Sequence, residues 1–108
     1  MANAYKVLGQ VSPAATTNTT LYTVPSATST VASTLTVCNR SVATSVRVAI
    51  RPAGATLSNE HYILYDAFVN ANDTLFLTIG VSLSTTDVVT VYAGTANVSF
   101  NLYGTEIT

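Results

Sequence analysis

Apolar and polar residues alternate along most of the chain. The run "TLFLTIGVSLS" at 74–84 places its apolar residues, from Leu75 to Leu83, on one side, and "NVSFNLY" at 97–103 does the same around Phe100. A period of two residues is that of a β-strand with one buried face. Similar runs, alternating or rich in β-branched and aromatic residues, stand at 4–11, 20–24, 33–39, 45–51, 61–67 and 87–93. No window shows a 3.6-residue period, so no helix longer than a turn is expected.

Turn-forming residues separate these runs. The segment "NRSVAT" at 39–44 predicts a hairpin that joins the strands around Val37 and Val48, with Arg40 in its turn. The segment "AGTAN" at 93–97 predicts a second hairpin, with Gly94 at a positive φ. Seven or eight short strands at regular spacing are typical of a sandwich or barrel. We therefore expect one all-β domain over 1–108, an antiparallel β-sandwich of jelly-roll or immunoglobulin-like form.

The inward-facing positions of these strands predict the core. Burial of each Leu or Phe among them contributes roughly 1.5–3 kcal/mol. The predicted core consists of Val7, Leu21, Leu35, Val37, Val46, Val48, Ile50, Ile63, Leu75, Leu77, Ile79, Val89, Val91, Val98, Phe100 and Leu102.

The chain carries little charge. Charged residues make up 8% of it, with 4 Lys and Arg against 5 Asp and Glu, where about 25% is usual. A net charge of −1 leaves no basic patch for nucleic acid and little electrostatic protection against association. We therefore expect neighbouring proteins to use much of the surface; the alternative is a monomer kept soluble by its many hydroxyl groups.

No stretch has the composition of a signal peptide or a membrane span. We expect a protein that is made in the cytoplasm and stays soluble until assembly, with no membrane partner.

The residues that could carry chemistry are few and scattered. His61 is the single histidine, and Glu60 beside it would point to the opposite face of a shared strand. Cys38 has no second cysteine, so neither an internal disulfide nor a zinc site is expected. Asp73 and Asp87 precede strands, where bonding to the backbone explains them. We expect no enzyme activity, no catalytic or metal-binding residues and no cofactor.

The tyrosines leave one binding function open. Tyr62, Tyr65, Tyr92 and Tyr103 occupy strand positions that fit a core. Were they exposed, they could form a platform for sugars, so a carbohydrate-binding module remains an alternative.

Three of the four cations lie close together in the sequence. Arg47 and Arg51 fall on one face of a strand, and Arg40 lies in the turn before it. Arginine pairs well with carboxylates, which a neighbouring subunit or the same sheet could supply. We expect Arg40, Arg47 and Arg51 to be candidate intersubunit contacts in a homo-oligomer with cyclic symmetry, most simply a trimer.

The order of several segments resembles a known group of proteins. "LYTVP", "CNRS", "RPAGATLSNEHYI", "TDVVTVYA" and "GTEI" follow one another between about Leu8 and the end of the chain. This order is similar to that of small structural proteins of tailed bacteriophages, cyanophages among them. The resemblance implies a non-enzymatic component of the virion.

Within that group, proteins of this size that coat a capsid are commonly trimeric β-sandwich decoration or cement proteins. The expected partners are the major capsid protein and sister copies. We prefer the capsid because a repeated shell protein needs little charge and much interface. A tail or fibre accessory protein is the alternative location.

Overall fold

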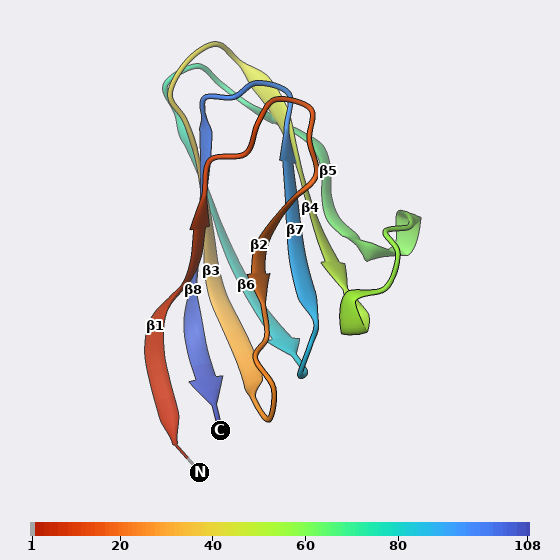
Figure 1. The fold of residues 1–108 in the computed structure, drawn as a ribbon. Coiled ribbons are helices and arrows are strands. Elements are labelled where there is room, and N and C mark those ends of the chain that lie inside the picture. Colours follow the sequence, from red (N-terminus) through yellow and green to blue (C-terminus); the bar gives the residue numbers. More distant parts are fainter. Residues whose placement is uncertain (1) are drawn as a thin grey trace.

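The computed structural model describes residues 2–108, which form eight β-strands (Figure 1). Two 3₁₀ turns, η1 (Pro52–Gly54) and η2 (Asn59–His61), interrupt the chain between the fourth and fifth strands. The described residues contain no longer helix, as the absence of a helical period predicts. The strands are β1 (Asn3–Val11), β2 (Thr19–Thr23), β3 (Ser29–Asn39), β4 (Thr44–Arg51), β5 (Tyr62–Val69), β6 (Thr74–Leu83), β7 (Val88–Ala93) and β8 (Val98–Ile107).

The strands form two four-stranded antiparallel sheets packed as a sandwich. The first sheet has the order β1-β8-β3-β6 and the second the order β2-β7-β4-β5. Four antiparallel pairs follow from the folding of the chain: β1 with β8, β2 with β7, β3 with β6, and β4 with β5. The chain is thus a long hairpin folded over itself, which is the jelly-roll arrangement of eight strands. An immunoglobulin domain would distribute its strands differently, so the first of the two expected forms is the correct one.

The two predicted hairpins are wrong. Strands β3 and β4 lie in different sheets, so the segment 40–43 crosses the sandwich instead of closing a hairpin. The segment between β7 and β8 also crosses from one sheet to the other and closes no hairpin. Gly94, in this segment, does not have the positive φ that a hairpin turn was expected to require. The period of two residues identifies strands, but it does not say which strands are hydrogen-bonded neighbours.

The core lies between the sheets and matches most of the prediction. Phe100, Leu35 and Leu102 are its largest fully buried members. Ile50, Leu75, Leu77 and Ile79 are partly buried and pack against it, three of them from the edge strand β6. The prediction missed the buried side chains of Tyr22, Val24, Ala32, Val69, Leu83 and Ala93.

Val7 and Ile63 are wrong as core residues, because both are exposed. A register shift in β1 between Val7 and Gly9 inserts Leu8, which packs against the core in place of Val7. A second register shift lies in β5. Tyr62 and Leu64 pair with the consecutive residues Ala49 and Val48 of β4, so Ile63 between them has no partner. A β-bulge adds one residue and so moves the inward face of the strand by one position.

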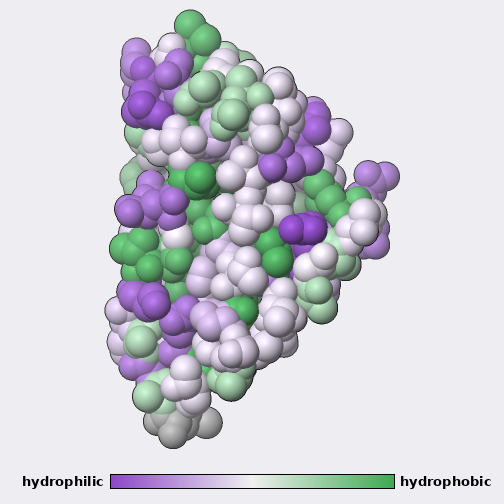
Figure 2. Space-filling view, in the orientation of Figure 1, coloured by the Kyte–Doolittle hydropathy of each residue, from purple (hydrophilic) through white to green (hydrophobic). Residues whose placement is uncertain are grey.

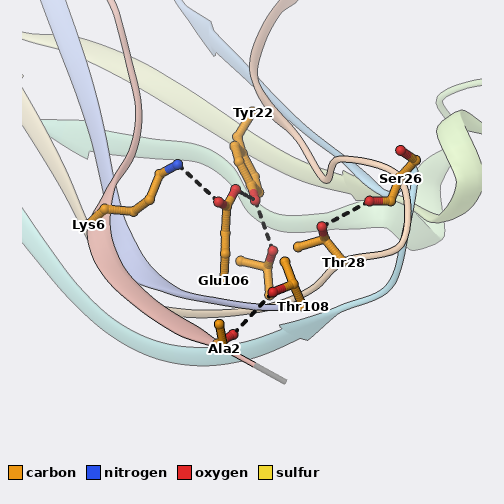
Figure 3. A network of polar contacts seen from close by, with 8 residues as sticks. Ala2, Lys6, Tyr22, Ser26, Thr28, Glu106 and Thr108 are labelled. Atoms are coloured by element: carbon orange, nitrogen blue, oxygen red, sulfur yellow. Dashed lines mark hydrogen bonds and ion pairs between the residues drawn. The ribbon is translucent and has the colours of Figure 1, made fainter.

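A polar network joins the two sheets near the chain termini (Figure 3). The hydroxyl of Tyr22, on β2, donates to Glu106 Oε2 at 2.6 Å and lies 2.8 Å from the hydroxyl of Thr30. Lys6 Nζ contacts Glu106 Oε1 at 2.9 Å. Burial, and then the bond to Glu106, raises the pKa of Tyr22 to about 12. The bonds from Tyr22 and Lys6 lower the pKa of Glu106. The network therefore holds a neutral phenol against an ionised carboxylate.

Candidate functional site

The outer face of the first sheet carries no charged side chain among the described residues. Residues opposite each other in neighbouring antiparallel strands share a face, so the register identifies this surface. Tyr103, for example, opposes both Val7 and Thr34. We call the surface the neutral face; it consists of Asn3, Tyr5, Val7, Gln10, Ser29, Val31, Thr34, Thr36, Cys38, Thr74, Phe76, Thr78, Ser82, Ser99, Asn101, Tyr103, Thr105 and Ile107.

The neutral face exposes aromatic rings in a hydroxyl-rich surface. Tyr5 is 81% exposed and Phe76 is 71% exposed, and Val7 and Val31 are also exposed. Lys6 and Glu106 belong to the same sheet, but they oppose Gly104 and Thr30 on the other face and bond to each other. Figure 2 shows the side of the sandwich in the orientation of Figure 1, where purple, pale and green residues are mixed and no large area of one kind forms.

The outer face of the second sheet is different, because Arg47 and an aromatic cluster occupy it. Val46 opposes Ala67 and Val48 opposes Leu64, so Tyr65 and Asp66 both stand opposite Arg47. This bulge has Asp66 at a φ of 52°, a conformation that aspartate tolerates better than most residues. In a regular strand, Tyr65 and Asp66 would point to opposite faces; the bulge lets both reach the same arginine.

Arg47 is held on three sides. Its Nε donates to Asp66 Oδ1 at 2.6 Å and its Nη2 to Oδ2 at 3.3 Å. Its guanidinium carbon lies 4.3 Å from the ring centroid of Tyr65 and 4.5 Å from that of Tyr92, within the range of cation–π contacts. The hydrogen bonds to Asp66 raise the pKa of Arg47. We call these four residues the arginine cluster.

A hollow of about 510 Å³ adjoins the arginine cluster and is lined by Asn59, Tyr62 and Tyr65. The rings of Tyr62 and Tyr65 have centroids 4.9 Å apart and planes at 81°, so they form two walls at a right angle. Asn59 belongs to η2, in the segment that projects from the sandwich after β4 (Figure 1). We call these three residues the aromatic corner.

The four tyrosines at strand positions that fit a core are not core residues. Tyr65 is 59% exposed, and Tyr62, Tyr92 and Tyr103 are partly exposed. The tyrosine that is buried is Tyr22. Alternation divides a strand into two faces, and the other strands decide which face meets the core.

The predicted arginine face is present, since Arg47 and Arg51 both lie on the outer side of β4. Arg51 donates to the hydroxyl of Thr90 at 3.1 Å and to the carbonyl of Ala55 at 3.0 Å. Arg40 donates to the hydroxyl of Ser12 at 2.9 Å. Each arginine thus has a partner in its own chain, and the carboxylate that Arg47 needs comes from the same sheet. Their role between subunits stays a prediction.

The other polar residues that the sequence singled out have structural roles. Asp73 accepts from the backbone of Thr74, and Asp87 accepts from the backbones of Ser84 and Ala53, as predicted. His61 Nδ1 accepts from the backbone of Ser58, which closes the η2 turn. Within residues 2–108, no three His, Cys, Asp or Glu side chains are grouped to hold a metal ion.

The described part of the chain contains no helix that is long and apolar enough to cross a membrane. No protein-family model matches the chain, and no curated protein matches it significantly.

Proposed function

We propose that this protein is a non-enzymatic structural component of a phage particle, a decoration or cement protein that binds the capsid shell through its neutral face. The observation that carries the proposal is an entire outer sheet face without charge. Docking of such a face strips no ion of its water, which is the main cost of burying charged surface.

The composition of the neutral face favours a protein partner. The centres of protein interfaces are depleted of charged residues and enriched in aromatic ones. Tyr5 and Phe76 supply exposed rings, and the hydroxyl and amide side chains of the same face supply hydrogen-bonding groups. The partner is a surface of similarly low charge, which a shell of repeated subunits presents many times.

The experiment compares two exposed phenylalanines on opposite sheets. Phe76, on the neutral face, is 71% exposed, and Phe68, on β5 of the second sheet, is 67% exposed. Shells of the phage that encodes the protein, prepared without it, are mixed with the parent, Phe76→Asp and Phe68→Asp proteins and sedimented. We expect the parent and Phe68→Asp to sediment with shells and Phe76→Asp to remain in solution.

Several outcomes would overturn the proposal. They are no association of the parent with shells, equal binding of all three proteins, or loss of binding only in Phe68→Asp. Quantitative mass spectrometry of purified particles separates shell from tail: a copy number close to that of the shell protein is expected, and a few copies found with tails would favour the tail alternative. The mass of the protein, measured free in solution and bound to the shell, tests whether sister copies contact each other as expected.

A further inference from the structure

We infer that the aromatic corner is a binding site for a neutral saccharide. This site is on the opposite sheet from the neutral face, and the inference does not depend on what the neutral face binds. The corner combines an open hollow, two aromatic walls and one amide side chain.

The exposed ring of Tyr65 is held in place before any ligand arrives. Arg47 packs against it, and Asp66 and Tyr92 fix Arg47 in turn. Tyr62 meets it edge to face. A side chain that is already ordered loses little conformational entropy on binding, so more of the contact energy appears as affinity. Exposed rings in fixed positions are the usual anchors of recognition surfaces.

The charges around the corner favour an uncharged ligand. Arg47 is already paired with Asp66 through two hydrogen bonds, so its guanidinium is not free for a phosphate or carboxylate. Glu60, next to Asn59, would also repel an anion. A neutral molecule avoids this repulsion.

The shape and polarity of the corner fit a sugar ring. A pyranose has a face of C–H groups, which packs on an electron-rich aromatic ring, and an edge of hydroxyl groups. The amide of Asn59 both donates and accepts hydrogen bonds, as a hydroxyl requires. Two perpendicular rings and one amide can therefore contact a face and an edge of the same saccharide. Ligand pockets commonly combine apolar walls with few polar groups in this way.

The test starts with an array of neutral oligosaccharides, which includes β-1,4-linked glucose and N-acetylglucosamine tetramers and α-linked mannose tetramers. An oligogalacturonate of equal length serves as the anionic control. The full chain is labelled with ¹⁵N and titrated with the best neutral glycan. We expect saturable shifts at Asn59, Tyr62 and Tyr65, and none with the oligogalacturonate.

Variants then assign the site. Tyr65→Ala is expected to weaken binding at least about tenfold, which corresponds to ~1.4 kcal/mol. Tyr65→Phe keeps the ring and should retain most of the affinity. Phe68→Ala removes a similarly exposed ring from the same strand, outside the hollow, and should bind like the parent. Amide spectra of each variant confirm that it is folded. Absence of binding to every neutral glycan, preferred binding of the anion, or parental affinity in Tyr65→Ala would overturn the inference.

Discussion

The two outer faces of this sandwich are built from the same kind of strand, yet they differ in almost every respect. The neutral face spreads hydroxyls, amides and exposed rings over four strands with no charged side chain. The outer face of the second sheet concentrates two arginines, an aspartate and several tyrosines around β4 and β5, and the segment from η1 to η2 folds beside it. The first resembles the middle of an interface between proteins, and the second resembles a small ligand site.

Backbone irregularity accounts for much of this difference. On the second sheet, the bulge at Asp66 turns two consecutive side chains toward Arg47, and the unpaired Ile63 shifts Tyr62 into the corner. The bulges of the first sheet, at Leu8 and Ser33, move apolar residues between faces without gathering polar ones. Bulges at a sheet edge commonly re-aim side chains, and in this protein they gather a cluster only on β5.

The largest effect is expected from a substitution in the core, because the core supports both outer faces. Phe100 is fully buried between the sheets, so Phe100→Ala leaves a cavity and should lower the free energy of unfolding by about 3–5 kcal/mol. Urea unfolding followed by circular dichroism measures it. Shell binding and glycan binding should be lost over the same range of urea, because one core supports both surfaces. A loss below ~1 kcal/mol would contradict the placement of Phe100.

The next change acts on the first sheet alone. A Cβ on Gly104 would collide with the carbonyl oxygen of Val31 on the neighbouring strand. Since backbone cannot move aside easily, Gly104→Ala should cost about 3 kcal/mol, the upper part of the range for overpacking. Amide shifts should concentrate in β3 and β8 and leave the arginine cluster unchanged.

Gly80→Ala is the control for that substitution. Gly80 has a φ of 57° and no atom within 4 Å of an added Cβ. Its expected cost of about 1–2 kcal/mol comes from backbone conformation alone. An equal or smaller loss in Gly104→Ala would contradict the close approach of β3 and β8.

The network that joins the sheets predicts a dependence on pH. Tyr22 has a pKa of about 12 in the folded chain and an ordinary value near 10 when unfolded. Its contribution is complete below pH 10 and is lost as pH rises to 12, because the unfolded state releases the proton first. The loss should reach ~2–3 kcal/mol. Tyr22→Phe should show a flatter decline over this range; identical slopes would contradict the proposed role.

The contribution of Glu106 to stability has the opposite pH dependence to that of Tyr22, because it is lost as the pH falls. Its pKa is lowered in the folded chain, so its contribution is present above the ordinary pKa of glutamate and is lost as pH falls through the lowered value. Glu106→Gln should remove this acid-dependent part. An unchanged acid slope in Glu106→Gln would assign the dependence to other carboxylates.

The smallest effect on stability is expected at the arginine cluster. Asp66 is substantially exposed, and exposed ion pairs contribute little, so Asp66→Asn should melt at the temperature of the parent. The side chain of Arg47 should nevertheless become mobile, with faster exchange of its Nε proton in NMR spectra. Asp73→Asn is the control, because the carboxylate of Asp73 accepts from the backbone of Thr74 and not from Arg47. An unchanged Arg47 signal in Asp66→Asn would show that the tyrosines alone hold it.

Most of the strands could be predicted from the sequence because alternation is a local property. The faces of β6 and β8 follow it closely, from Leu75 to Leu83 and from Val98 to Leu102. Prediction failed at Val7 and Ile63, where a bulge shifts the period. Of the candidate site, the common face of Arg47 and Arg51 was predictable. The aromatic corner was not, because the register shifts of β5 that orient Tyr62 and Tyr65 are set by its pairing with β4, which the local sequence does not show.

The sequence by itself determined that this protein is an all-β chain with a single apolar core and very little charge, because composition and a two-residue period are visible without any contact between distant residues. The tertiary structure decided the rest. It determined the jelly-roll order of the strands, the face of each sheet that meets solvent, and the pairing of Arg47 with Asp66 beside two tyrosines. These features depend on which strands become neighbours and where the register shifts, and long-range pairing of the whole chain sets both.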